Sequence, residues 1–282
     1  MHEHASGHIG CFNPSGSLDF WISDMTYEYY LRVIRGAVSA AWDFGISLVL
    51  YSGGPQRCEE TLDRIAGSEN LKGVIILGDW FNQGVLRKIS AWGIPAAAVG
   101  CSVSDRISSV SQDHRLGGYL AAEHLIKRGH GRIAYIGQAD DPVSDSGRFA
   151  GYLDALKHHG IAADPRLWVS APFAEGGGRR AMNKLLARER DFSAAVFFSD
   201  NLFYECFEVM SSMGLRVPED IGAVGFDDTL RSICSSPALT TVHSPLEEMG
   251  RRAVEIVTEQ NPCAALQVQH EVLPVYLVQR ET

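Results

Sequence analysis

Two apolar patterns alternate along the whole chain, and this alternation limits the folds that the sequence can adopt. Short aliphatic runs, many of them β-branched, predict strands, whereas segments with apolar residues at three-and-four spacing predict helices. Parallel neighbours need a helical crossover, so the repeated alternation indicates an α/β fold with parallel sheets covered by helices. The candidate strands are residues 9–12, 46–51, 74–77, 96–99, 133–136, 167–169, 194–198 and 222–224.

Four helices have clear signals between and after these strands. In the first, Tyr27, Tyr30, Leu31, Ile34, Val38, Ala41 and Trp42 fall on one face. A second helix covers about 113–128 and a third about 146–159, and a glycine follows each of them. A fourth begins near Pro245 and has apolar residues at 246, 249, 253 and 257.

The number of strand–helix units predicts two lobes. About eight units exceed a sheet of five or six strands, and 282 residues suffice for about two domains. We therefore predict two doubly wound parallel-sheet lobes. The alternation of strands and helices is interrupted at 108–112 (SSVSQ), where we expect the first crossover between lobes. It is interrupted again at 238–242 (ALTTV), where we expect the second crossover.

Composition excludes several classes of protein. The net charge is −9 and no block of Lys or Arg occurs, so this chain lacks the basic surface of a stand-alone nucleic-acid binder. Its longest apolar stretches fall far below the ~20 residues of a membrane helix, and no secretory signal is visible. The six scattered cysteines, with no C-x-x-C, indicate reduced and mostly buried thiols of a cytoplasmic protein.

Polar and aromatic residues follow the predicted strands. Ligands of open parallel sheets bind beyond the carboxyl ends of the strands, so these residues are candidates for contact with a polar ligand. Any one of them alone is explained better by a turn or a helix N-cap, but the set as a whole favours a polar ligand. The set comprises Asn13, Asp79-Trp80, Cys101-Ser102, Asp140-Asp141, Phe173, Asp200-Asn201 and Asp227-Asp228.

Enzymatic signatures are missing. The Gly-rich run at 175–180 lacks the G-K-[ST] ending of a phosphate loop, and neither G-x-S-x-G nor H-E-x-x-H occurs. We interpret His158-His159 as a solvated helix end, and His130 and His243 as structural. The histidines in residues 1–8 could bind a metal, but a frayed terminus or expression remnant explains them better. We predict no catalytic residue, metal or cofactor.

Several motifs then occur in a fixed order. Residues 29–36 read YYLRVIRG, residues 110–118 read VSQDHRLGG, and residues 146–152 read SGRFAGY. HLIKRGHGRIAYIG follows the second of these motifs, and VPEDI, GFDD and ALTTV come later in the chain. Together they resemble the lactose/galactose repressor (LacI/GalR) family of transcriptional regulators, and the resemblance covers nearly all of residues 8–282.

The resemblance implies a type I periplasmic-binding-protein fold. Its two lobes are joined by three crossovers, and a small molecule binds in the cleft between them. We expect residues 8–111 and 240–262 to form the N-terminal lobe. Residues 112–239 and 263–282 would form the C-terminal lobe, and residues 1–7 a disordered or expression-derived start.

The resemblance also implies partners. Family members form homodimers, here expected through residues 202–210 and 55–65, and bind operator DNA through an N-terminal helix-turn-helix. The first strand begins near His8, so we expect the chain to be the sensor core of a longer regulator, or a naturally headless homologue. Operator DNA is expected as a partner only through the missing domain.

The family motifs imply a set of effector contacts. Arg148 and Asp227 would contact the effector from the C-terminal lobe, beside Asp200 and Phe173. Tyr30, Cys101 and Asp79 would contribute from the N-terminal lobe. Two departures bear on the ligand: the segment 13–25 is longer than the usual first loop, and the Asn-Asp pair of the family is reversed here at Asp200-Asn201.

Three functions are compatible with these observations. The first is the effector-binding domain of a cytoplasmic LacI-type regulator that senses a sugar or sugar derivative. The alternative is a periplasmic sugar-binding protein of an ABC transporter, which shares the fold. The third, an α/β enzyme, is disfavoured by the missing motifs.

Overall fold

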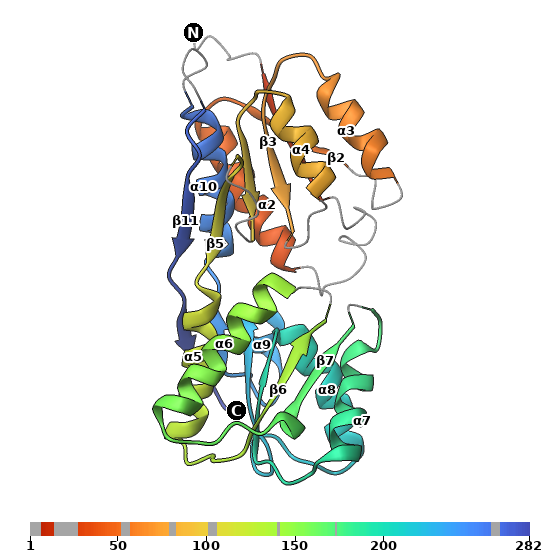
Figure 1. Ribbon diagram of the computed structural model, residues 1–282, viewed down its shortest axis with the longest axis vertical. Coiled ribbons are helices and arrows are strands. Elements are labelled where there is room, and N and C mark those ends of the chain that lie inside the picture. Colours follow the sequence, from red (N-terminus) through yellow and green to blue (C-terminus); the bar gives the residue numbers. More distant parts are fainter. Residues whose placement is uncertain are drawn as a thin grey trace. The chain divides into compact units, whose positions relative to one another are not determined.

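Strands and helices alternate along the computed structural model, as the apolar pattern predicts (Figure 1). The structure describes residues 7–13, 28–51, 57–78, 83–100, 106–139, 142–172, 174–260 and 266–282. The described strands form two six-stranded sheets, which confirms the predicted α/β class with two sheets. The chain divides into two compact units, one of Met1–Gln112 with Pro245–Leu273, the other of Asp113–Ser244 with Pro274–Thr282.

The first unit holds a sheet in which all neighbouring strands run parallel, in the order β11-β5-β4-β3-β1-β2. Its strands are β1 His8–Phe12, β2 Ser47–Tyr51, β3 Leu71–Leu77, β4 Ala96–Val99, β5 Ser108–Gln112 and β11 His270–Leu273. Its helices are α2 Glu28–Asp43, α3 Cys58–Ala66, α4 Gln83–Ala91 and α10 Leu246–Thr258. Helices α2 and α10 pack in one apolar core and α3 and α4 in another, so both faces of the sheet are covered.

The second unit repeats this plan with the strand order β12-β10-β9-β8-β6-β7, in which only the edge strand β12 is antiparallel. Its strands are β6 Ile133–Gln138, β7 Trp168–Ala171, β8 Ala194–Phe197, β9 Gly222–Asp227, β10 Thr241–His243 and β12 Tyr276–Val278. Its helices are α5 His114–Lys127, α6 Pro142–His158, α7 Gly177–Arg188, α8 Asp200–Ser212 and the short α9 Leu230–Cys234. Helices α5 and α6 share one core, and α7 and α8 share the other.

The chain crosses between the units at positions that differ from the expected ones. Residues 108–112 form β5, a fully buried strand, and the first crossing follows it. Strand β10 pairs with β9, so residues 240–244 lie in the second unit and the second crossing comes at Pro245. We expected residues 266–273 in the C-terminal lobe. Instead they belong to the first unit, where strand β11 pairs with β5.

Helix α2 buries only part of the face that its large apolar residues predict, because Tyr30, Ile34 and Ala41 pack in the core but the others do not. Leu31, Val38 and Trp42 are exposed, Trp42 by 84%. Apart from Val33, the buried residues are small: Gly36, Ala37, Ala40 and Ala41. A Cβ at position 36 would lie 1.8 Å from the carbonyl oxygen of Glu247. Close packing against α10 therefore selects the small-residue face.

The apolar residues that we expected at a dimer interface lie inside their own unit. Leu202, Phe203, Cys206, Val209 and Met210 of α8 are all buried in the core that α8 shares with α7. Of the other expected segment, Leu62 and Ile65 of α3 are likewise buried. These side chains stabilise the fold of each unit.

Two other sequence expectations can be compared with the described residues. The four cysteines among them, Cys11, Cys58, Cys206 and Cys234, are free thiols, of which Cys11 and Cys206 are buried. In this part of the chain no helix has the length and apolar character required to cross a membrane.

Candidate functional site

One edge of the second sheet gathers polar and aromatic residues. Strands β6, β8, β9 and β10 are parallel, so their carboxyl ends share this edge. Phe198 follows β8, Asp227 ends β9, and Ser244 follows β10. Arg148 reaches the same edge from α6. We call these four residues, together with Phe226, the Arg148 site.

The Arg148 guanidinium is held between two aromatic rings. Its central carbon lies 3.6 Å from the centre of the Phe226 ring and 4.2 Å from that of Phe198. The side chain is almost buried, and a desolvated cation–π contact contributes about 2 kcal/mol. Nη1 donates to the carbonyl oxygen of Phe198, and Nε donates to Nδ1 of His114 at 3.3 Å. The plane and direction of the guanidinium are therefore fixed.

Close packing of α5 against α6 brings Arg148 to this place. A Cβ at Gly118 of α5 would lie 1.9 Å from the carbonyl oxygen of Arg148, so only glycine allows this approach. Helix α5 begins at an N-cap formed by Asp113, whose carboxylate accepts from the backbone N–H of Leu116 at 2.8 Å. His114, the first residue of the helix, thereby reaches the Arg148 Nε.

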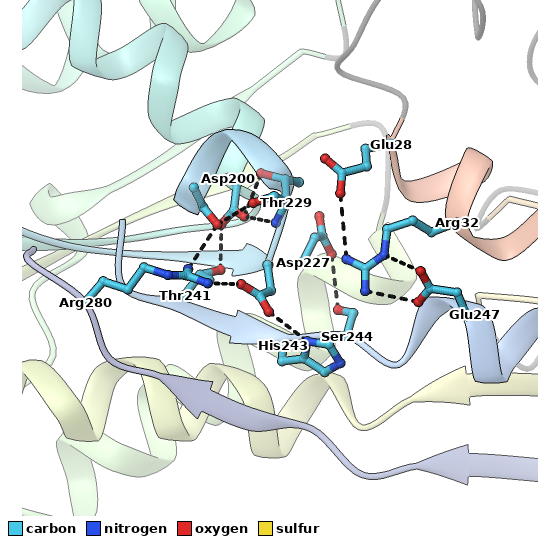
Figure 2. Close-up of polar contacts among 12 residues, drawn as sticks. Glu28, Arg32, Asp200, Asp227, Thr229, Thr241, His243, Ser244, Glu247 and Arg280 are labelled. Carbon is cyan, nitrogen blue, oxygen red and sulfur yellow. Dashed lines mark hydrogen bonds and ion pairs between the residues drawn. The ribbon is translucent and has the colours of Figure 1, made fainter. Parts of the chain in front are cut away.

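Asp227 faces Arg148 from the end of β9. Its Oδ1 lies 3.8 Å from Arg148 Nη2. The same oxygen accepts a hydrogen bond from Ser244 Oγ at 3.3 Å (Figure 2). The backbone of Asp227 has φ +105°, which is strained for a residue other than glycine. Such strain is commonly found at ligand sites, where the surrounding structure maintains it.

Asp228 turns to a second set of partners. It also has a positive φ, +56°, and its carboxylate bonds Nδ1 of His243 at 2.8 Å and the guanidinium of Arg280. Burial alone would raise the pKa of Asp228, but the contacts with His243 and Arg280 outweigh it and lower this pKa. His243 also stacks on Tyr276 of β12 at 4.6 Å. The network ties β9, β10 and the C-terminal segment together.

Asp200 lies beneath the site and is completely buried. Its Oδ2 accepts from the backbone N–H of Thr229 at 2.8 Å and from the Thr229 hydroxyl at 3.0 Å. Its Oδ1 accepts from the Thr241 hydroxyl at 2.6 Å (Figure 2). Burial, with a further contribution from the charge of Asp227, raises the pKa of Asp200 to about 7. These contacts brace β9, β10 and α9 rather than present the carboxylate at the surface.

The structure brings together only part of the predicted contact set. Arg148 and Asp227 meet, and Asp200 lies under them without exposure. Tyr30 belongs to the first unit, where it is half-buried and packs edge-on against Tyr29 at 5.2 Å. In that unit Arg32 forms two hydrogen bonds with Glu247, which tie α2 to α10. Asp79, Cys101 and Phe173 lie outside the described residues.

The sequence analysis did not name three residues of the site, Phe198, Phe226 and Ser244, as contacts, nor their neighbour His114. Phe198, just after β8, and Phe226 of β9 look like ordinary core aromatics. Phe226 and His114 do lie inside the GFDD and VSQDHRLGG motifs, and these motifs were the available signal. A buried guanidinium such as that of Arg148 also needs aromatic or carbonyl neighbours to cover it. His130 and His243 are held by Ser193 and Asp228, in keeping with the structural roles we expected.

The site has the chemistry of recognition. A guanidinium donates in a planar fork and a carboxylate accepts, so together they orient vicinal hydroxyls or an anionic group. Elsewhere among the described residues, Glu123, His158 and His159 hold potential ligand atoms close enough together for a metal ion. None of the three belongs to the Arg148 site.

A solved structure described as a LacI family transcriptional regulator from Mycobacterium smegmatis is 30% identical to this chain and superposes with a TM-score of 0.82. The alignment covers 97% of this chain and 98% of that one. The chain belongs to the LacI family of transcriptional regulators. The profile of the periplasmic binding protein-like domain matches residues 122–282, which is more than half of this LacI-family chain.

Two further relatives support the assignment to the LacI family. The transcriptional regulator CelR, solved as a complex with cellobiose, is 27% identical with a TM-score of 0.88, over 97% of this chain and 84% of that one. The regulator GalR of Escherichia coli K12 is 40% identical over 148 residues, which make up 52% of this chain and 43% of GalR. This LacI-family chain thus aligns with less than half of GalR, and these relatives are regulators rather than enzymes.

Proposed function

We propose that this chain is the effector-sensing part of a LacI-type regulator, and that Arg148 and Asp227 bind a small polar effector, a sugar or sugar derivative. The observation that supports this proposal most directly is the fixed guanidinium of Arg148 beside the Asp227 carboxylate. Arg148 Nη2 and Asp227 Oδ1 are 3.8 Å apart, so the two charges attract each other although this distance is too long for a hydrogen bond. A ligand hydroxyl beside them can accept from Nη2 and donate to the carboxylate.

The chemistry of the site favours a carbohydrate class of ligand. Vicinal hydroxyls match a paired donor and acceptor, and the relative CelR was solved as a complex with cellobiose. The relatives are transcriptional regulators, which does not favour the alternative of a periplasmic sugar-binding protein. Asp200 acts in this proposal as a brace for Asp227, and Tyr30, Asp79, Cys101 and Phe173 remain proposed contacts.

The remaining features of the regulator are proposals of the same kind. Operator binding would require a helix-turn-helix domain beyond the chain described here, in line with the net charge of −9. We propose a cytoplasmic homodimer, as in the family, with the effector adjusting the affinity for DNA.

Calorimetric titration tests the binding site. A panel of monosaccharides, disaccharides including cellobiose, and nucleosides is first screened by thermal shift, because a ligand at 100 times its Kd adds about 2.7 kcal/mol of stability. For the best ligand we expect Arg148→Ala and Asp227→Asn each to weaken binding about 30-fold or more, on the order of 2 kcal/mol, because a desolvated partner is left unpaired.

Arg179→Ala, at an exposed arginine of α7, is the matched control and should leave the affinity unchanged. Arg148→Lys keeps the charge and loses the fork, so it should bind almost as poorly as Arg148→Ala. If the Arg148 and Asp227 variants lower the unfolding temperature while ligand affinity stays the same, the pair is a structural ion pair and the proposed site is wrong.

A further inference from the structure

The C-terminal ends of α5 and α6 bring three metal-ligating side chains together. The two helices pack side by side in one core, and Arg115 of α5 pairs with Asp154 of α6 at 2.6 Å. Further along, Glu123 of α5 meets His158, the last residue of α6, and His159, which follows it. One ligand atom from each lies within 4.8 Å of the other two.

Tyr119 and Lys127 hold the carboxylate of Glu123 in place. The Tyr119 hydroxyl donates to Glu123 Oε1 at 3.0 Å and lies 2.5 Å from Nδ1 of His158. Because its single proton goes to Glu123, the hydroxyl accepts from Nδ1–H, and this tautomer leaves a lone pair on Nε2 of His158. Lys127 bonds the other carboxylate oxygen, Oε2, at 2.8 Å.

The remaining imidazole approaches the same carboxylate oxygen. Nε2 of His159 lies 3.6 Å from Glu123 Oε1. The two histidine rings are neighbours, with centres 5.0 Å apart and planes inclined by 36°. Both histidines are exposed, so an ion can reach them from solvent.

The electrostatic setting favours a cation. The carbonyl ends of both helices point toward this region, and a helix C-terminus attracts positive charge. The carboxylate of Glu123, to which Lys127 and Tyr119 are bonded, lies in this region as well.

We propose that Glu123, His158 and His159 bind a divalent transition-metal ion of the zinc class, with Tyr119 as the positioning residue. Two imidazoles and one carboxylate are the ligand set of open zinc sites, in which water completes the coordination. Calcium and magnesium prefer oxygen ligands and would bind poorly here. The site lies apart from the Arg148 site in its residues, and a bound ion would join the ends of α5 and α6.

Zinc titration calorimetry tests the proposal. His2 and His4 are first replaced by alanine, because the terminal histidines offer competing ligands. We expect one zinc ion per chain and a higher unfolding temperature with zinc, but no comparable effect with magnesium. His158→Ala and His159→Ala should each abolish this binding, and Glu123→Gln should weaken it strongly.

Tyr119→Phe should weaken zinc binding about 10-fold, the usual cost of losing a partner that orients a metal ligand. The Tyr119→Phe substitution should also shift the visible absorption of Co²⁺ bound at the site. If Tyr119 had only a structural role, this absorption would not change. Lys157→Ala, at the adjacent exposed residue of α6, is the matched control and should retain zinc binding. Absence of zinc binding, or zinc binding that persists in both histidine variants, would overturn the proposal.

Discussion

Asp227 and Asp228 show how two adjacent identical residues acquire different roles. Both have positive φ values, and this backbone sends one carboxylate toward Arg148 and Ser244 and the other toward His243 and Arg280. The strain at both positions is offset by these contacts. The Asp227 carboxylate lies beside the fixed guanidinium of Arg148. The Asp228 carboxylate links strand β9 to His243 of β10 and to Arg280.

Buried Asp200 leads to a prediction about pH. Its pKa is about 7 in the folded chain and near 3.8 when exposed. The folded chain thus retains a proton that the unfolded chain has released between these values. The contribution of Asp200 to the free energy of unfolding is therefore fully present below pH 4 and is lost as pH rises through 7.

Asp200→Asn keeps the shape and removes this titration, since an amide can accept from Thr229 and donate to the hydroxyl of Thr241. Urea unfolding from pH 4 to 8 should show the stability of the natural chain falling relative to that of the Asn variant. Asp200→Ala should cost about 1–3 kcal/mol throughout, because buried donors lose their acceptor. Parallel stability curves for the natural chain and the Asn variant would contradict the raised pKa.

At the scale of elements, helix packing positions Arg148. Gly118 and Gly151 lie where α5 and α6 touch, and a Cβ at either would come within 2 Å of a carbonyl oxygen of the other helix. The same device brings α2 against α10 at Gly36 and Gly250. Small residues at these contacts set the spacing of helices and hence the reach of side chains toward the sheet edge.

Gly118→Ala tests this dependence. The added methyl group must push α6 away, so we expect a loss of about 1–3 kcal/mol in the free energy of unfolding. Effector affinity should fall as well, since the backbone of Arg148 is the part displaced. Gly131→Ala is the control, because a Cβ there meets no atom within 4 Å and should change neither quantity. An unfolding midpoint that does not change in Gly118→Ala would show that α5 and α6 can move apart with no loss in the free energy of unfolding.

At the scale of the whole molecule, the C-terminal segment completes both sheets. Strand β11 pairs with β5 in the first sheet, and β12 pairs with β10 in the second. The last residue, Thr282, is buried and donates its hydroxyl proton to the carbonyl oxygen of Ala223 at 2.7 Å. The two units are therefore tied together by the chain itself at three crossings.

Net charge leads to a prediction for the whole chain. Affinity for duplex DNA depends on cations that replace the counterions of phosphates, and this chain carries −9. Fluorescence anisotropy with labelled duplexes at low salt should detect no specific binding. Tight, salt-sensitive binding of this chain to a duplex would contradict our assignment of operator contact to a separate domain.

The sequence by itself determined the α/β class, most strand positions and the family, because hydrophobic period and ordered motifs are local properties. Strands at 96–99 and 133–136 lie within or at the observed bounds, and the motif arginine and aspartate, Arg148 and Asp227, do meet. The strand positions and the motifs depend on residues close together in the chain, whereas the contact between Arg148 and Asp227 is made by the fold.

Only the tertiary structure decided which faces are buried and which partners each polar group finds. Trp42 is exposed because the small residues of α2 pack against a helix some 200 positions away in sequence. Asp200 is a buried brace because Thr229 and Thr241 bond its carboxylate. Residues 270–273 joined the first sheet because β5 offered a parallel edge. Burial and pairing arise from contacts distant in sequence, which a local pattern does not encode.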